Sequence, residues 1–274
     1  MEARALEPRS AAGLSLLERP GEAGRPALLL LHGIGSHAES WRALMQALPG
    51  PHRAIAWDAP GYGGSTPVPE PAARPEHYAA ALRNLLDALG LERVILAGHS
   101  LGCLFAARFA ATWPERVAGL ALLSPALGYA VPPGAPLPAG VQARIDDLRQ
   151  LGPEAFAEKR AARLLHQPER KPAVLEGVRR AMAAVKPEGY AQAVHALGAG
   201  DLLADAALLR GPLLVAVGAE DVVTPPANAR RLQAALPPGT PLHDMPEAGH
   251  ALPQEAPGAT AALLAGLMMD GSAG

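Results

Sequence analysis

The sequence predicts an α/β protein in which helices cover both faces of a mostly parallel sheet and one all-helical segment interrupts the alternation. Short apolar runs alternate with helical patterns in the first and last parts of the chain. The run Leu28–Leu31 holds four consecutive leucines, which suits a strand buried on both faces of a parallel sheet. Between residues 127 and 200 only helical patterns occur. We therefore expect a core formed by residues 1–126 and 201–274 and a helical cap formed by residues 127–200.

The composition is that of a globular protein with a sizeable core. The chain has 274 residues, 49% of them hydrophobic, enough for one large domain or a domain with an insertion. The net charge is −2 and no long basic cluster occurs, so we expect no nucleic-acid partner. Cys103 is the only cysteine, which excludes an internal disulfide. The N-terminus lacks a signal-peptide pattern and the uncharged stretch 117–142 contains five prolines, so we expect a cytoplasmic protein with no membrane contact. The oligomeric state stays open.

Apolar runs bounded by turn residues predict the strands. The first run, residues 13–18, is short, and we expect it at an edge of the sheet. The later runs are more apolar and suit interior strands. The expected strands are residues 13–18, 26–31, 53–57, 94–97, 117–123, 213–217 and 241–245.

Helical periodicity bounded by proline and glycine predicts the helices. Gly90 suits a C-cap, and Pro114 closes the helix that follows Ser100. Pro153, Pro172 and Pro187 lie at or near first-turn positions, where proline costs little. The expected helices of the core are residues 40–48, 76–89, 103–111, 226–235 and 259–269, and those of the cap are residues 141–151, 154–166, 173–185 and 188–197.

The stretch Val94–Gly102 contains the pattern G-x-S-x-G, directly between a predicted strand and a predicted helix. So sharp a turn strains the backbone at Ser100, and glycines two residues before and after it remove side chains that would clash. The turn exposes the Ser100 hydroxyl at the strand end. The Leu101 amide is left free at a helix N-terminus, where it can face a developing negative charge. Ser100 is therefore the candidate nucleophile, and Leu101 is a candidate oxyanion donor.

A serine hydroxyl needs a neighbouring base, and the base needs a group that orients it. Reactive groups in a parallel sheet gather at the carboxyl ends of strands, which directs attention to the strands after Ser100. Asp221 follows the strand at 213–217; Glu220 is the rival carboxylate, and the loop pattern G-x-x-D-x-x-x-P favours Asp221. His250 follows the last strand and completes the order Ser, Asp, His. We expect structural, packed or solvated positions for His32, His37, His52, His99, His166 and His195.

The loop after the leucine strand supplies a second candidate oxyanion donor, the amide of Ile34. The same loop also matches a dinucleotide-binding pattern, because residues 33–38 read G-x-G-x-x-A and Asp58 ends the next strand. This competing interpretation leaves the Ser, Asp and His residues unexplained and does not predict an all-helical insertion. No H-E-x-x-H motif or cysteine pair suggests a metal site.

With these residues assembled, the chain resembles the α/β-hydrolase family over nearly its whole length. The matching segments are His32–Gly35, Asp58–Ser65, Gly98–Gly102, the Asp221 loop and Gly249-His250. The resemblance implies an eight-stranded sheet with a cap between strands six and seven. Some members carry an alternative acid after strand six; this chain has Ser124 there, which supports Asp221. Residues 187–191, 201–203 and 223–226 are similar to the enol-lactonase branch, which opens 3-oxoadipate enol-lactone in aromatic catabolism.

We therefore expect a serine hydrolase that cleaves a small-molecule carboxylic ester or lactone through an acyl-enzyme, with no cofactor. Ser100 attacks the carbonyl, His250 takes its proton and Asp221 orients His250. The amides of Ile34 and Leu101 bind the oxyanion.

Two alternatives stay open. The first is a carbon–carbon bond hydrolase of aromatic ring-cleavage products; such relatives tend to carry an aromatic residue after the catalytic histidine, where this chain has Ala251. The second is a non-catalytic binding protein on the same fold. Substrate choice belongs to the cap, whose arginines are either surface groups or contacts for a substrate carboxylate: Arg160, Arg163, Arg179 and Arg180.

Overall fold

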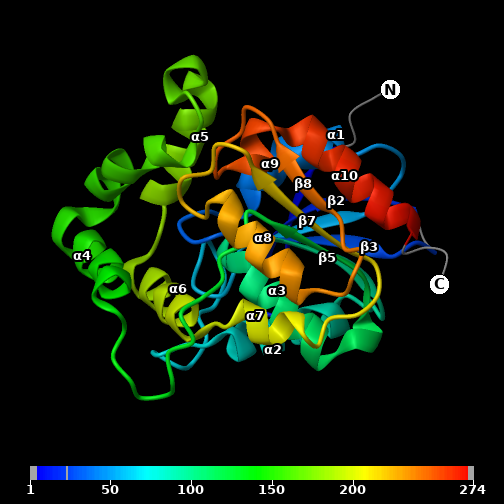
Figure 1. Ribbon diagram of the computed structural model, residues 1–274, viewed down its shortest axis with the longest axis horizontal. Coiled ribbons are helices and arrows are strands. Elements are labelled where there is room, and N and C mark those ends of the chain that lie inside the picture. Colours follow the sequence, from blue (N-terminus) through cyan, green and yellow to red (C-terminus); the bar gives the residue numbers. More distant parts are fainter. Residues whose placement is uncertain (1–4, 23, 271–274) are drawn as a thin grey trace.

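The described residues form one eight-stranded sheet (Figure 1). A computed structural model describes residues 5–22 and 24–270 of the chain. The strands are β1 (Glu7–Ala11), β2 (Leu14–Arg19), β3 (Ala27–Leu31), β4 (Ala54–Trp57), β5 (Val94–His99), β6 (Val117–Leu123), β7 (Leu213–Gly218) and β8 (Leu242–Met245). Their order is β1-β2-β4-β3-β5-β6-β7-β8, in which the pairings β1–β2 and β2–β4 are antiparallel and the others are parallel. The predicted fold class, a mostly parallel eight-stranded sheet, is confirmed.

The prediction that residues 13–18 form an edge strand is wrong. β2 covers this run, but β1 pairs outside it in an antiparallel hairpin that sets Ala11 opposite Leu14. Four of the five β1 residues are exposed, so no apolar alternation marks that strand in the sequence. β2 is buried along most of its length, as expected for a strand with neighbours on both sides.

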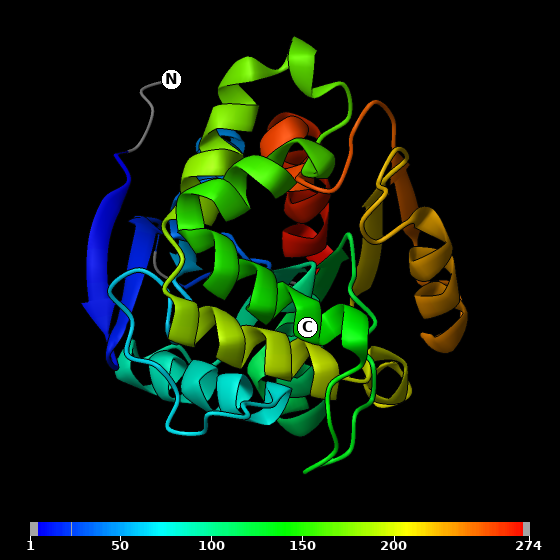
Figure 2. The same cartoon turned by 90° about the vertical axis from the view of Figure 1, so that its left-hand side faces the viewer.

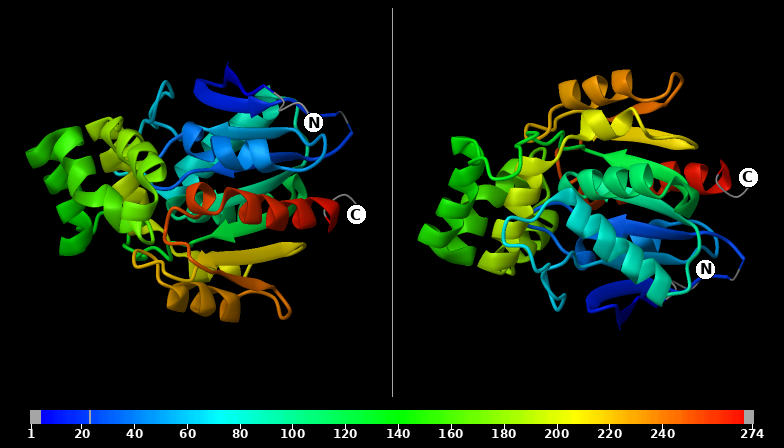
Figure 3. Two further views of the ribbon diagram at one scale, coloured as in Figure 1. Left: turned by 90° about the horizontal axis from the view of Figure 1, so that it is seen from above. Right: turned by 90° about the horizontal axis from the view of Figure 1, so that it is seen from below.

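Two layers of helices cover the sheet (Figure 3). Successive side chains of a strand belong to the cores beneath opposite layers. Leu29 and Leu31 join the core beneath α2 and α3, whereas Leu28 and Leu30 join the core beneath α1 and α10. All four leucines are fully buried, as their consecutive run predicts. The first layer contains α2 (Pro75–Ala88), α3 (Leu101–Thr112), α7 (Leu202–Ala206) and α8 (Pro226–Ala235), and the second contains the short turn η1 (Ala38–Trp41), α1 (Arg42–Ala47), α9 (Leu252–Glu255) and α10 (Pro257–Asp270). The remaining turn of this region is η2 (Pro114–Arg116).

The chain between β6 and α7 is irregular over residues 124–138 and mostly helical from Ala139 onward, and its helices lie at one end of the sheet (Figures 1 and 2). It contains α4 (Ala139–Arg160), η3 (Ala161–Leu164), η4 (Pro168–Arg170), α5 (Pro172–Ala183) and α6 (Pro187–Ala199). The helix α4 is broken at Gly152, whose φ of 75° is left-handed, and Pro153 starts the second half. The predicted break between two helices therefore falls in the right place, although the second half ends earlier than predicted. No helix among the described residues is long and apolar enough to cross a membrane.

The strand order reverses at β3, and this reversal places the site. From β3 the chain crosses to β4 on one side and later enters β5 on the other side. Open α/β sheets bind ligands at the carboxyl ends of the strands beside such a reversal. Ile34 follows β3, Ser100 follows β5, and Asp221 and His250 follow β7 and β8, so all four emerge at the same end of the sheet.

Candidate active site

Ser100 occupies a strained turn between β5 and α3. Its backbone has φ of 54° and ψ of −114°, a conformation that few residues other than glycine adopt. A Cβ atom at Gly98 would overlap the Gly102 carbonyl oxygen, and one at Gly102 would overlap the Leu31 carbonyl oxygen. The Ser100 amide donates to the Leu123 carbonyl at 2.9 Å, which anchors the turn to β6. Both glycines of the pattern are therefore needed for the turn that presents the serine.

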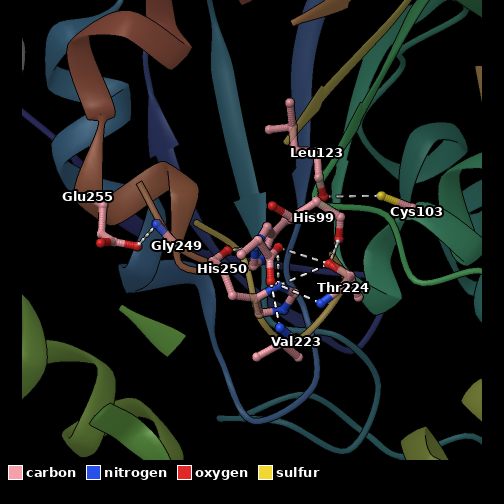
Figure 4. A network of polar contacts seen from close by, with 10 residues as sticks. His99, Cys103, Leu123, Val223, Thr224, Gly249, His250 and Glu255 are labelled. Carbon is pink, nitrogen blue, oxygen red and sulfur yellow. Dashed lines mark hydrogen bonds and ion pairs between the residues drawn. The ribbon is translucent and has the colours of Figure 1, made fainter. Parts of the chain in front are cut away.

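His250 and Asp221 form a buried hydrogen-bonded pair beside this turn. His250 Nδ1 lies 2.9 Å from Asp221 Oδ2, and the exposed fractions of the two residues are 4% and 2%. Asp221 Oδ1 also accepts the amides of Val223 and Thr224 at 2.8 and 2.9 Å (Figure 4). Burial acts to raise the pKa of Asp221, but the bonds from His250 and the two amides outweigh it and hold this pKa below its usual value. An ionised carboxylate keeps the His250 proton on Nδ1 and leaves Nε2 as the basic nitrogen.

Thr224 is a member of this network that the sequence analysis missed. Its hydroxyl oxygen lies 3.0 Å from Asp221 Oδ2 and 3.1 Å from His250 Nδ1, and it donates to the Ser124 carbonyl oxygen at 2.9 Å (Figure 4). It therefore joins the end of β6 to the loop that carries the acid. Thr224 could have been found in the sequence, because a hydroxyl three residues after Asp221 can reach its carboxylate. Glu220, the rival carboxylate, is exposed to solvent.

The residue before the serine contacts the backbone of the histidine. His99 Nε2 donates to the His250 carbonyl oxygen at 2.7 Å. Burial, followed by the charge of His250, lowers the pKa of His99 to about 3, so His99 is a neutral donor. Among the described residues no hydrogen bond joins the Ser100 hydroxyl to the His250 ring, although both side chains line one cavity. Bonds of this kind are often long without substrate and shorten when it binds.

His32 joins the loops after β3 and β4. Its Nδ1 donates to the Gly33 carbonyl at 2.8 Å, and its Nε2 accepts the Ala59 amide at 3.0 Å. Burial lowers the pKa of His32 to about 4, which keeps the ring neutral, as this donor–acceptor pattern requires. Asp58 is the candidate ribose-binding acid of the dinucleotide interpretation. Its carboxylate accepts the Ala38 amide at 2.8 Å, at the start of the turn η1.

The amides of Ile34 and Leu101 are available to a bound oxyanion. Both residues line the cavity together with Ser100. In the part of the chain that the structure describes, neither amide donates to a protein acceptor. A Cβ atom at Gly33 would lie only 2.9 Å from the Ser100 Cβ, so glycine is what lets this loop approach the serine.

A cavity of about 460 Å³ lies over Ser100, a size that suits a small molecule. One wall comes from α8 and the loops after β3, β5, β6, β7 and β8, and the other comes from α4, η3, α5 and α6. The apolar side chains of that second wall are Phe156, Leu164, Met182 and Leu197. No cluster of three or more potential metal-binding side chains occurs in residues 5–22 and 24–270.

The charged side chains that line the cavity are all cationic: Arg144, Lys159, Arg160, Arg163 and Arg231. Asp147 lies outside the cavity and forms ion pairs with Arg160 at 2.6 Å and with Lys159 at 3.4 Å. For the other three arginines the structure records no carboxylate partner among its described residues.

The expected cap arginines divide into two pairs. Arg160 and Arg163 line the cavity, whereas Arg179 and Arg180 pair with Glu176 outside it. The sequence analysis missed Arg144 and Arg231. Each is one arginine on a helix, and nothing in the local sequence tells which face of that helix turns toward the cavity.

The chain belongs to the α/β-hydrolase fold family, whose model matches residues 26–257. A Pseudomonas putida hydrolase named for 2-hydroxy-6-oxononadienedioate and 2-hydroxy-6-oxononatrienedioate is 38% identical over 113 residues. That alignment spans 40% of this chain and 40% of the relative. A Variovorax paradoxus protein, named as a candidate carbamate hydrolase, is 33% identical over 84% of this chain and 87% of its own length.

Two solved structures extend the similarity to almost the whole molecule. A thermophilic esterase from Thermogutta terrifontis superposes with a TM-score of 0.83 at 26% identity, covering 98% of this chain and 99% of the esterase. The enol-lactonase from Burkholderia xenovorans LB400 also has a TM-score of 0.83, at 25% identity, covering 96% of this chain and all of the lactonase. The expectation of an α/β-hydrolase enzyme is thus confirmed.

Proposed function

We propose that this protein is a serine hydrolase that cleaves a carboxylic ester or lactone of a small molecule. The observation that carries the proposal is the buried His250–Asp221 pair, whose histidine lines one cavity with a serine on a strained turn. The similarity to an esterase and an enol-lactonase supports the same reaction class. Residues 127–200 serve as a cap that closes the cavity over the serine.

The reaction follows from the positions of the donors and acceptors. Ser100 Oγ attacks the carbonyl carbon while His250 Nε2 takes its proton, and Asp221 stabilises the resulting imidazolium. The amides of Ile34 and Leu101 bind the oxyanion, with a contribution of roughly 3 kcal/mol for each well-placed donor. His250 then protonates the leaving alkoxide. Water activated by His250 cleaves the acyl-enzyme and releases the acid. With a lactone, the alkoxide stays attached to the acyl group and a single hydroxy acid leaves.

Covalent labelling tests the proposal. A fluorophosphonate reagent is expected to label Ser100 stoichiometrically, because His250 activates the hydroxyl and the two free amides donate hydrogen bonds to the phosphonyl oxygen. Intact-mass measurement followed by peptide mapping locates the label. Heat-unfolded protein is the control and should stay unlabelled. Folded protein that remains unlabelled at Ser100 would contradict the proposal and favour the binding-protein alternative.

The charges of the cavity favour a substrate that carries an anionic group besides the reacting carbonyl. Arg144 is half-buried and faces the Tyr190 hydroxyl, and Arg163 and Arg231 are exposed at the cavity lining. Hydrogen bonds between such cations and a carboxylate are stronger than neutral ones, typically about 1.5–3 kcal/mol each. The described residues that line the cavity include no aspartate or glutamate. A substrate carboxylate would therefore be attracted by the arginines and would not be repelled by a neighbouring carboxylate.

Two matched esters test this charge preference. Arg144→Gln is expected to raise KM for p-nitrophenyl hemiglutarate about 10-fold or more, from the loss of one charge-assisted bond. KM for neutral p-nitrophenyl pentanoate, which has an acyl chain of the same length, should change less than about twofold, because no such bond is lost. Arg179→Gln is the matched control, since Arg179 pairs with Glu176 outside the cavity. An equal effect of Arg144→Gln on the two esters contradicts the preference.

A carbon–carbon bond hydrolase is the second candidate, favoured by the 38% identity to the Pseudomonas putida hydrolase. The catalytic geometry would be shared, but Ala251 replaces the aromatic residue expected after the histidine. We favour ester or lactone cleavage because an esterase and an enol-lactonase, each at a TM-score of 0.83, are among the structural neighbours that span nearly the whole chain. Side-by-side rates on an ester and on a 2-hydroxy-6-oxo-dienoate decide between the two.

A further inference from the structure

Glu255 at the end of α9 has a buried carboxylate that holds the loop that carries His250. The Glu255 side chain has no solvent-exposed surface. Its Oε2 accepts the Gly249 amide at 2.8 Å, a bond visible in Figure 4. Its Oε1 accepts the His166 amide and the Lys171 ammonium group, both at 2.8 Å. No step of the hydrolytic reaction uses Glu255, yet it is bonded to the residue directly before the proposed base.

Two of the three partners of Glu255, His166 and Lys171, come from the segment between α4 and α5, within the proposed cap. Lys171 also donates to the Glu247 carbonyl at 2.8 Å. The Ala251 amide donates to the Leu164 carbonyl at 2.9 Å. Gly249 has no room for a Cβ atom, because the backbone of residues 164–166 fills that space. Residues 164–166 therefore pack backbone to backbone against the loop at 247–251, and Lys171 reaches the same loop with its side chain.

These contacts fix the backbone at three consecutive residues around His250. The Gly249 amide is bound by Glu255, the His250 carbonyl by His99, and the Ala251 amide by the Leu164 carbonyl. Because the backbone of His250 is held on both sides, its imidazole ring can move only by rotation about the side-chain bonds. The hydrogen bond to Asp221 restricts these rotations. Displacing a reacting group by about 1 Å can cost on the order of 100-fold in rate, so this anchoring matters for proton transfer from Ser100.

We propose that Glu255 is a positioning residue for His250, and that through it the cap segment 164–171 is a fixed part of the active site. This inference rests on the proposed serine-hydrolase function. It predicts that the isosteric change Glu255→Gln lowers kcat about 10- to 100-fold for a p-nitrophenyl ester, while KM changes less than about twofold. A glutamine keeps one acceptor oxygen, but its NH2 group must then face buried N–H donors, which breaks at least one of the three bonds.

Two further variants sharpen the test. Glu247→Gln changes an exposed carboxylate of the same loop, whose side chain makes no recorded contact, and should leave kcat unchanged. Lys171→Met removes the counter-charge of Glu255 and the bond to the Glu247 carbonyl, and should lower kcat in the same direction as Glu255→Gln. Lys171 is partly exposed, with 24% of its side chain accessible, so this variant carries the test if Glu255→Gln does not fold.

The outcomes separate positioning from a merely structural role. If Glu255 only stabilises the fold, Glu255→Gln lowers the Tm but leaves kcat per folded molecule unchanged at 25 °C, and the proposal is overturned. The NMR signals of the His250 ring, assigned by their loss in His250→Gln, give a readout that needs no turnover. They should shift in Glu255→Gln and not in Glu247→Gln. A wild-type enzyme that hydrolyses neither esters nor lactones refutes the proposed function, and an unshifted His250 ring refutes the positioning role.

Discussion

Replacing Ser100 with alanine is expected to reduce kcat for a p-nitrophenyl ester by at least about 10⁴-fold, because the acyl-enzyme can no longer form. The residual rate comes from the amides of Ile34 and Leu101, which still polarise the carbonyl. Alanine has the same Cβ as serine at the strained φ of 54°, so the turn and the Tm should be retained. Stopped assays with purified protein, together with circular dichroism and thermal melts, measure both quantities.

Ser124→Ala is the matched control for this variant. Ser124 is also buried, has a positive φ of 44° and carries a side-chain oxygen without a recorded hydrogen-bond partner. Its turnover should stay within about threefold of wild type, since only its backbone carbonyl takes part in the Thr224 contact. Cys103 offers no replacement nucleophile, because burial raises the pKa of its thiol far above the usual range. Comparable turnover in Ser100→Ala and wild type would sink the assignment of the nucleophile.

Asp221→Asn is expected to lower kcat by about 10⁴-fold with little change in KM. Asp221 is surrounded by donors: the amides of Val223 and Thr224, besides His250 Nδ1. An asparagine must point its NH2 group either at those fixed donors or at His250. The first choice leaves a buried donor without an acceptor, and the second shifts the His250 proton to Nε2, where the base is needed.

The pH dependence distinguishes Asp221 from its neighbour. Because the pKa of Asp221 is lowered in the folded state, its carboxylate stays ionised at all pH values above its usual pKa of about 4. Above that pH, protonation of Asp221 therefore contributes nothing to the loss of wild-type activity. Glu220→Gln alters the exposed rival carboxylate, and its pH–rate profile should overlay that of wild type. A larger loss in Glu220→Gln than in Asp221→Asn would exchange the two roles.

Most of the fold could be predicted because each element carries a local signal. The interior strands are consecutive apolar runs, as at Leu28–Leu31, and parallel strands buried on both faces must have such runs. The break inside α4 could be predicted from Gly152-Pro153, which cannot continue a helix. The strand β1 could not, because a hairpin edge stabilised mainly by backbone bonds needs no apolar pattern. Its presence moved β2 from the edge to the interior of the sheet.

The sequence by itself determined which residues stand at the strand ends. A turn that only glycines permit marked Ser100, and the rule that carboxyl ends of parallel strands meet at one edge indicated Asp221 and His250. Only the tertiary structure decided what surrounds them. Glu255 contacts His166 and Lys171 across 89 and 84 positions of the chain, and Thr224 reaches Ser124 across 100. Such contacts leave no local pattern, because they depend on how the cap and the loops pack together. The direction in which Arg144 and Arg231 point depends on the same packing.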